Sequence, residues 1–310
     1  MLQIIADGLV IGSVVSLGAI GLSLTFSILR FSNFGHGELL AWGAYIALSA
    51  LAVFVALGSP SAPAPAFSPF SFGWPLLAAL AVAAVGTALL ALALDWLLFR
   101  RLRKEGHITL VIASFGAALA LRNVLLYVYG GVPQYYSTEL QIAIPLLPRS
   151  QWGGMRITAD QLLVLGLPAV LVVALHLFLQ RSTLGRAMRA TAMNPQLARV
   201  AGIDPEQVLR ATWVLGAVLA AVAGVFAGLT VQLRPTLGLD LLLPLFAAVV
   251  LGGIGSVWGA VWGGLIVGLA ESAAVQVVGA EYRAAASFAV LILILMFRPQ
   301  GLLGRQTDLR

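Results

Sequence analysis

The chain has 310 residues, of which 60% are apolar and only 10% are charged, and its mean hydropathy is +0.99. Soluble domains have about 25% charged residues, so this chain has too few charges to cover a surface that faces water. It contains no cysteine, which excludes disulfides, thiolate metal sites and a cysteine nucleophile. We therefore expect an all-α polytopic membrane protein whose main surroundings are the lipid bilayer.

The formal net charge of +6 does not indicate nucleic-acid binding. Nucleic-acid binding uses a basic patch or stripe on one face, whereas the basic residues here stand singly or in short clusters between long apolar runs. This distribution is typical of membrane topology signals. We expect no nucleic acid among the partners.

Eight apolar runs are long enough to cross the hydrocarbon layer of a bilayer, which is roughly 30 Å thick. They lie at residues 8–29, 37–57, 74–99, 108–130, 159–180, 211–233, 257–278 and 283–297. A ninth run, at 241–251, is short and ends in a glycine cluster, which is typical of a broken helix or re-entrant segment. We predict about nine passes, within a range of eight to ten, in a single transmembrane domain that covers 1–310.

The basic residues also predict the orientation, because cytoplasmic loops collect lysine and arginine. Alternation of the runs places 13 of the 18 basic residues on one side. They are Arg30, Arg100, Arg101, Arg103, Lys104, Arg181, Arg186, Arg189, Arg199, Arg210, Arg298, Arg305 and Arg310. The first run is too long for a cleavable signal. We expect a multi-pass protein with its N-terminus outside and its C-terminus in the cytoplasm.

The basic connection between residues 181 and 210 contains two helix starts. Asn194 precedes Pro195, which is a capping side chain followed by a residue suited to the first helical position, and Gly202 is a natural stop. Asp204 repeats the start signal. The first of these helices would have barely two turns, which is marginal in water, so it needs a surface to pack on. Lipid headgroups and a groove on a soluble partner are the alternatives, and the residues alone favour headgroups slightly.

Polar residues interrupt the apolar pattern between the first two runs. They are Asn33, Gly35, His36, Gly37 and Glu38, with Phe34 among them. An ionised group at the bilayer centre costs about 2.5–3.5 kcal/mol. The segment therefore either lies in headgroup water or forms unwound backbone that lines a cavity. The sequence supports both alternatives evenly.

A second interruption ends the short ninth run at Gly252 and Gly253 and continues through Gly255 and Ser256. Adjacent glycines weaken a helix by about 1 kcal/mol each relative to alanine, so the break could offer backbone groups to a substrate. One break near each end of the chain suggests a weak internal two-fold repeat.

The same glycine-rich region predicts close helix packing, because Gly255, Gly259 and Gly263 recur every four residues and would line one helix face.

Other charged or polar residues lie inside the apolar runs. Arg122, Asn123 and Glu271 are further candidates for a translocation pathway. Asp95 lies near the basic boundary of its run, and we expect it to pair with Arg100 or Arg101.

Motifs for catalysis and nucleotide binding are absent from the sequence. It has no G-x-x-x-x-G-K-[ST] phosphate loop, no H-E-x-x-H zinc motif and no G-x-S-x-G nucleophile elbow. We therefore expect neither an enzyme nor a metal or nucleotide site in this chain. Transport is the function that a polytopic chain with polar interruptions indicates.

Several segments together carry a family resemblance. They are N-F-G-H-G-E at 33–38, F-R-R-L-R at 99–103, T-L-G-R-A-M-R-A-T-A at 183–192, Q-L-A-R-V-A-G at 196–202, L-G-G-I-G-S at 251–256 and F-R-P-Q-G-L at 297–302. These segments resemble the permease family of ATP-binding-cassette importers for branched-chain amino acids, and specifically the shorter of its two permease types. Gly35, Arg101, Gln196 and Leu197 depart from the family's pattern.

The resemblance implies a permease subunit in a bacterial inner membrane that imports leucine, isoleucine, valine or related amino acids by alternating access. Its partners would be a second permease, two ATP-binding-cassette ATPase subunits and a periplasmic substrate-binding protein. The ATPase subunits, and not this chain, would bind ATP and Mg²⁺. Residues 183–203 would form a cytoplasmic coupling loop that acts through Arg186, Arg189, Asn194, Leu197, Ala198, Arg199 and Gly202, which makes a partner groove the favoured surface for its short helix.

A different class of protein fits the broken helices as well. A self-sufficient secondary transporter or channel for a small polar solute would also use such breaks, together with intramembrane carboxylates such as Glu38 and Glu271.

Overall fold

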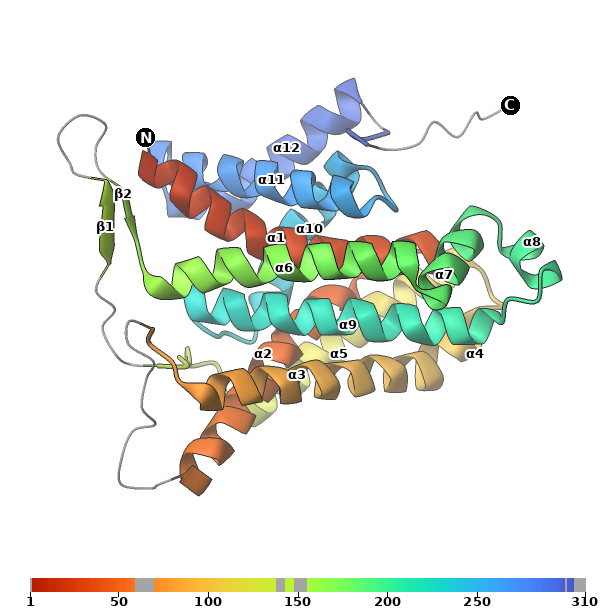
Figure 1. The fold of residues 1–310 in the computed structure, drawn as a ribbon, viewed down its shortest axis with the longest axis horizontal. Helices are drawn as coiled ribbons and strands as arrows, with labels where there is room; N and C mark the ends of the chain where they lie inside the picture. Colours follow the sequence, from red (N-terminus) through yellow and green to blue (C-terminus); the bar gives the residue numbers. More distant parts are fainter. Residues whose placement is uncertain (1, 59–69, 138–142, 148–154, 299, 304–310) are drawn as a thin grey trace.

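The computed structural model describes residues 2–58, 70–137, 143–147, 155–298 and 300–303. Within these residues nine main helices form a bundle (Figure 1). They are α1 (Leu2–Leu29), α2 (Gly35–Gly58), α3 (Trp74–Leu94), α5 (His107–Tyr129), α6 (Ala159–Arg181), α9 (Pro205–Thr230), α10 (Leu237–Gly252), α11 (Val257–Val277) and α12 (Arg283–Phe297). Every predicted run corresponds to one helix, and the prediction of an all-α polytopic membrane protein is confirmed.

Eight spans are long and apolar enough to cross a membrane, the last of them counted from Ala280 through α12, and α10 is a shorter apolar helix. With 16 residues, α10 is about 24 Å long at 1.5 Å per residue, which is less than the roughly 30 Å of hydrocarbon. Helices α1 and α9 each begin six residues before the predicted runs, since a helix extends beyond its apolar stretch into the polar interface.

Five shorter helical segments and one small sheet complete the fold. The helical segments are η1 (a π-helix, Asp95–Phe99), α4 (Arg100–Leu102), α7 (Thr183–Met193), α8 (Pro195–Val200) and η2 (a 3₁₀-helix, Ala280–Tyr282). The strands β1 (Ile144–Leu147) and β2 (Met155–Ile157) pair antiparallel, with Ile144 opposite Ile157. Strands of three and four residues are too short to give a sequence pattern, and this sheet was not predicted.

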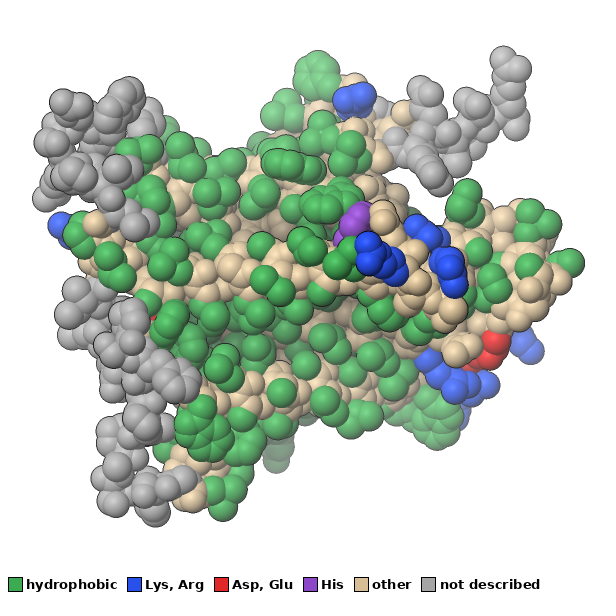
Figure 2. All heavy atoms as spheres, in the orientation of Figure 1, with side chains coloured by type: hydrophobic (Ala, Val, Ile, Leu, Met, Phe, Trp, Pro, Cys, Tyr) green, Lys and Arg blue, Asp and Glu red, His purple; other side chains and the backbone are tan. Residues whose placement is uncertain are grey.

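The bundle has two distinct ends, which we call the sheet end and the α8 end. The sheet and the start of α1 lie at the first, and α7 and α8 lie at the second (Figure 1). Lysine and arginine side chains gather at the α8 end, while apolar side chains cover the middle (Figure 2). The exposed arginines of α7 and of the adjoining ends of α6 and α9 lie there, as the loop charges predicted. Arg305 and Arg310 lie outside the described residues.

Helices α1 and α9 form the centre of the bundle. Their most apolar stretches are 83% and 78% buried, whereas the stretch that includes α12 is only 6% buried. Helices α3, α5 and α12 present large apolar side chains on the outside. Such a surface is suited to lipid or to another membrane subunit.

Small residues bring the backbones of α1 and α11 together. A Cβ atom added at Gly264 would collide with the backbone of Ser16, and one added at Gly268 would collide with the backbone of Gly12. The Ser16 hydroxyl donates a hydrogen bond of 2.9 Å to the carbonyl of Val261. Small residues and interhelical hydroxyl bonds are the two features that hold helices together in lipid.

The predicted glycine face is correct for two of its three members. Gly259 and Gly263 pack against the backbone of α10, at Gly252 and Ala248 respectively. Gly255 is not on this face, because α11 begins at Val257 and Gly255 lies in the preceding turn with φ of +84°.

Replacing Gly268 by alanine should lower the free energy of unfolding by about 1–3 kcal/mol, because α1 and α11 must separate to admit one methyl group. The matched control is Gly166→Ala on α6, where a Cβ meets nothing within 4 Å. This control should be neutral or should stabilise the helix by up to about 1 kcal/mol. Unfolding in mixed detergent micelles measures both. Equal stability of the two variants would show that α1 and α11 are not in close contact.

Candidate functional site

The connection from α6 to α9 is built from helix caps. The Ser182 hydroxyl accepts a hydrogen bond of 2.8 Å from Gly185 N and starts α7. Asn194 ends α7 and starts α8, because its Oδ1 accepts from Gln196 N at 3.0 Å and from Leu197 N at 3.1 Å. The two-turn helix predicted after Asn194 is therefore confirmed.

The end of α8 is set by Gly202, whose φ is +82°. Its N–H donates to the carbonyl of Arg199, and Ile203 N donates to the carbonyl of Ala198, both at 3.0 Å. Asp204 then caps α9 through Glu206 N at 2.9 Å. The predicted stop and second start are both confirmed, since each depends only on neighbouring residues.

The side chains of α8 divide into a buried and an exposed set. Ala198 is 5% exposed and anchors the helix to the rest of the protein. Leu197 is 66% exposed, Val200 is 87% exposed, and Met193 at the end of α7 is 70% exposed. The remaining predicted residues of this segment, Arg186, Arg189, Asn194, Arg199 and Gly202, are all exposed. The segment therefore presents an apolar face with arginines beside it.

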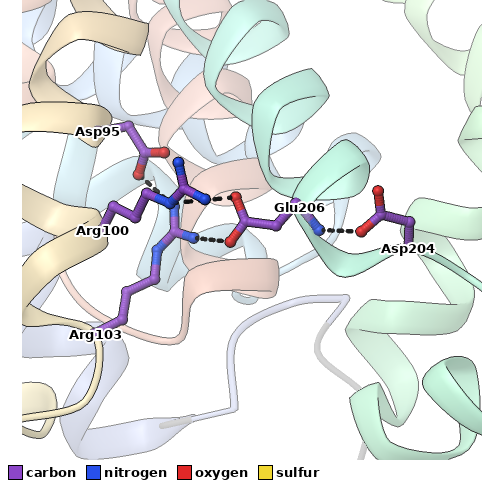
Figure 3. Close-up of polar contacts among 5 residues, drawn as sticks. All are labelled: Asp95, Arg100, Arg103, Asp204 and Glu206. Carbon is purple, nitrogen blue, oxygen red and sulfur yellow. Dashed lines mark hydrogen bonds and ion pairs between the residues drawn. The ribbon is translucent and has the colours of Figure 1, made fainter.

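An ion-pair cluster joins the start of α9 to η1 and α4, which continue the chain directly after α3 (Figure 3). Arg103 Nη2 contacts Asp95 Oδ1 at 2.5 Å, and Arg103 Nη1 contacts Glu206 Oε1 at 3.2 Å. Arg100 Nε lies 3.9 Å from Glu206 Oε2. The prediction that Asp95 pairs with Arg100 or Arg101 was wrong. Two turns of mixed π- and α-helix place residues eight apart on one side, so Asp95 reaches Arg103 instead.

The π-helix η1 also positions an aromatic residue in the core. Phe99, which is 1% exposed, stacks on Trp213 of α9 with ring centroids 5.2 Å apart. It also contacts Phe31, which follows α1, at 5.5 Å. The α8 end thus connects α3, α9 and the end of α1 through one set of buried rings and one set of ions.

The polar segment between α1 and α2 is enclosed by protein. Asn33, His36 and Glu38 are 2%, 0% and 4% exposed. Gly35 N donates to Asn33 Oδ1, and His36 Nε2 donates to the carbonyl of Gly18, both at 3.0 Å. Helix α2 begins at Gly35, so Gly35, His36, Gly37 and Glu38 form a first helical turn that is buried in protein, and the segment is neither in headgroup water nor unwound over these four residues.

Two buried atoms of this turn have no hydrogen-bond partner among the described residues. They are Nδ1 of His36 and Oε2 of Glu38. Buried polar atoms are nearly always hydrogen-bonded, and an exception calls for a water, an ion or a ligand. The role of this turn in a translocation pathway stays a prediction.

The second glycine break ends α10 as predicted, with Gly252 as its last residue and Gly253 at φ of +95°. Its backbone groups already have partners. Leu302 N donates to the carbonyl of Leu251 at 2.7 Å, and Leu303 N donates to that of Gly252 at 3.0 Å. The chain's own segment 300–303 therefore takes two of the carbonyls that a substrate was expected to contact.

The turn between α10 and α11 contacts α1. Gly255 N donates to Ser23 Oγ at 3.0 Å, and the side chain of Ser256 caps α11 through Gly259 N. The ring of Phe34, in the first break, lies 5.2 Å from that of Phe246 on α10. The first break thus packs against α10, and the second break forms the end of the same helix.

The remaining candidates differ in their surroundings. Arg122 is half-buried, and Asn123 is exposed on α5, where its amide donates to the carbonyl of Leu119 at 2.7 Å. Glu271 is 1% exposed and accepts from Arg283 Nε at 2.7 Å and from the hydroxyl of Ser287. Its charge is therefore neutralised by the neighbouring helix α12.

A cavity of about 670 Å³ opens between α1, α9, α10, α11 and α12, toward the sheet end. Of the predicted pathway residues, only Glu271 lines it. The charged residues in its lining are Asp7, Arg234, Asp240, Glu271, Glu281 and Arg283. This site could not be predicted from the sequence, because its charged members are separated by up to 276 positions. Asp7, Arg234, Asp240, Glu281 and Arg283 stand at the ends of apolar runs, whereas Glu271 lies inside one.

These features define a helical membrane transport protein. One end carries an exposed two-helix segment braced by ions, and a charged cavity opens toward the other end. The family model described as "Branched-chain amino acid transport system / permease component" matches residues 4–296. The chain therefore belongs to this permease family, and it is a transport component rather than an enzyme.

Two relatives whose names include permease protein agree with the family. The high-affinity branched-chain amino acid transport system permease protein BraD of Pseudomonas aeruginosa is 34% identical, over 98% of this chain and 96% of that protein. The corresponding permease protein LivH of Escherichia coli K12 is 33% identical over the same shares. The solved structure of PsaBC from Streptococcus pneumoniae in complex with Fab is similar with a TM-score of 0.49 and 13% identity, over 95% of this chain and 91% of that chain.

The ion-pair cluster gives a stability prediction. Arg103→Ala should lower the free energy of unfolding by about 3 kcal/mol, because it leaves the buried carboxylate of Asp95 without its partner. The neighbouring Arg101 is exposed, so Arg101→Ala should change stability by less than about 0.5 kcal/mol. Adding Asp95→Asn to Arg103→Ala should recover most of the loss. Unfolding in detergent micelles of the wild type, the two single arginine variants and the double variant measures the coupling between Arg103 and Asp95. Equal losses of stability in Arg103→Ala and Arg101→Ala would contradict this prediction.

Proposed function

We propose that this chain is the permease subunit of an ATP-driven importer for branched-chain amino acids, and that separate ATPase subunits move α7 and α8. Membership of the permease family supports transport of this substrate class, and so do the names of its relatives. The observation that carries the ATPase contact is the exposed apolar face of Met193, Leu197 and Val200 on a firmly capped helix.

Three properties of α8 favour a protein groove over lipid headgroups. The helix projects beyond the ends of the transmembrane helices, away from the apolar belt of the bundle (Figure 1). Exposed apolar side chains next to charged ones are typical of an interaction surface. Finally, α8 is held in shape by Asn194 and Ala198 before any partner binds, so little conformational entropy is lost on docking.

A movement of α8 has a direct path to the membrane core. Ile203 N is bonded to the carbonyl of Ala198, and Asp204 caps α9 directly afterwards. Helix α9 is one of the two central helices, and Glu206 in its first turn is tied to Arg103 beside α3. A partner that displaces α8 would therefore displace α9 and α3 together, as alternating access requires.

The proposed function also implies the orientation of the chain in the membrane and the subunits with which it assembles. The α8 end, with its gathered arginines, would face the cytoplasm, and the start of α1 would face the periplasm across the inner membrane. The complex would contain a second permease subunit, two ATPase subunits that bind ATP and Mg²⁺, and a periplasmic binding protein that delivers substrate to the sheet end.

The coupling role is tested at Leu197. Leu197→Asp should reduce uptake by roughly 10- to 100-fold, because burial of a leucine side chain contributes about 1.5–3 kcal/mol to docking. The side chain is exposed in the isolated chain, so the variant should insert and fold normally. The conservative variant Leu197→Met is the control and should retain uptake. Substrate uptake and ATP hydrolysis by the reconstituted complex are the measurements.

Full uptake by a well-assembled Leu197→Asp complex would refute the ATPase contact. The secondary-transporter alternative is tested separately, with the purified chain alone in liposomes under an ion gradient. Because we propose that the driving force comes from ATPase subunits, we expect no concentrative uptake there. Ion-driven accumulation of a substrate by the chain alone would overturn the proposed function.

A further inference from the structure

The cavity toward the sheet end carries opposite charges that do not neutralise each other. Arg234 follows α9, Asp240 lies in the first turn of α10, and Asp7 lies in α1. We propose that this cavity is a binding site for a zwitterionic α-amino acid. Arg234 binds the carboxylate, Asp240 and Asp7 attract the ammonium group, and the apolar wall takes the side chain. This inference rests on the proposed function and adds the site at which this permease holds its substrate.

The contacts of the charged residues support this assignment. Among the described residues, Arg234 has no carboxylate within 4.0 Å. Its partner is the neutral amide of Gln232, whose oxygen accepts from Arg234 Nε at 2.8 Å when the amide is turned toward it. Asp7 accepts from Gln3 at 2.9 Å, and Asp240 accepts from Thr236 at 3.1 Å. Each charge is thus oriented by a neutral neighbour and keeps its capacity for an ionic ligand.

The other charged pair in the lining has a different role. Glu271 and Arg283 are joined at 2.7 Å, with Ser287 as a second donor to Glu271. Their charges are satisfied within the protein, so this pair joins α11 to α12 and forms part of the cavity wall. Arg234, which has no carboxylate partner among the described residues, therefore marks the anion subsite, and a planar guanidinium is the group best suited to bind a carboxylate through two hydrogen bonds.

The remaining wall is apolar and has the size of a small-molecule site. Val10, Ile11 and Val14 line it from α1, and Leu241 and Pro244 line it from α10. A volume of about 670 Å³ lies within the range of about 300–1,000 Å³ for ligand pockets. Burying a leucine or valine side chain against such a wall should strengthen binding by roughly 10- to 100-fold. The site should therefore prefer amino acids with branched apolar side chains to glycine.

The first experiment measures equilibrium binding of radiolabelled L-leucine to the full chain, assembled with the second permease and the ATPase subunits but without the binding protein, in lipid nanodiscs. Loss of one charge-assisted contact in Arg234→Gln should weaken binding by roughly 10- to 100-fold. The matched control is Arg156→Gln, because Arg156 is an exposed arginine of β2 at the same end that does not line the cavity. This control should bind leucine like the wild type.

The second experiment separates recognition of charge from loss of structure. Competition with 3-methylbutylamine, which is leucine without its carboxylate, should be much weaker than competition with leucine in the wild type. In Arg234→Gln the two competitors should become similar. Asp240→Asn should show the opposite change and lose its preference for leucine over 4-methylpentanoate, which lacks the ammonium group. A misfolded site would instead lose all these ligands in proportion.

Three results would overturn the cavity assignment: no saturable leucine binding by the wild type, equal binding by Arg234→Gln and Arg156→Gln, or a proportional loss of all ligands in Arg234→Gln. The proposed function is tested independently by Leu197→Asp, which should keep leucine binding and lose uptake. If ATP-driven uptake is confirmed while the Arg234 and Arg156 variants behave alike, only the cavity assignment fails.

Discussion

The structure depends on the close approach of helix backbones around α1. In lipid, burial of apolar surface does not drive helices together, because the surrounding chains are equally apolar. Helices α1 and α11 are held instead by glycines such as Gly264 and Gly268 and by the hydroxyl of Ser16. The cavity and the glycine break both lie along this contact, since α1 and α11 line the first and Gly255 meets Ser23 at the second. Looser packing here would alter both regions at once.

The α8 end is held by different interactions. The buried rings of Phe99 and Trp213 fix α3 against α9, and Arg103 adds an ionic contact to Glu206 next to the helix cap at Asp204. These contacts form one rigid unit between the exposed segment and the core. An exposed α8 without this unit could move without consequence for the membrane helices. The π-helix is central here, because it turns Phe99 inward and Asp95 toward Arg103.

The features that depend on neighbouring residues could be predicted from the sequence. The length of each apolar run indicates a helix, and the caps at Asn194 and Asp204 are local hydrogen bonds. The partner of Asp95 could not be predicted, because the backbone there departs from a regular α-helix. The single domain over 1–310 and the internal two-fold repeat stay predictions.

Long-range contacts were beyond sequence analysis for a physical reason. The bond from Leu302 to the carbonyl of Leu251 joins backbone atoms, which carry no residue signal. The charged cavity joins Asp7 to Arg234 and Asp240, and nothing local to these residues shows that they share a wall. The charges at the ends of apolar runs predicted topology, but they could not show which of them meet.

In the proposed function, substrate binding at the cavity and the ATPase contact at α8 lie at opposite ends of the bundle. Helix α10 begins at the cavity with Asp240 and ends at Gly252, where residues 302 and 303 bind its last carbonyls. With 16 residues, α10 leaves the hydrocarbon layer incompletely spanned. A small shift of α10 along α1 would therefore change access at both of its ends. Because Gly252 and Ala248 lie in close backbone contact with Gly259 and Gly263 of α11, a movement of α10 would also act on α11. The small residues that hold this bundle together thus couple α10 to its neighbour.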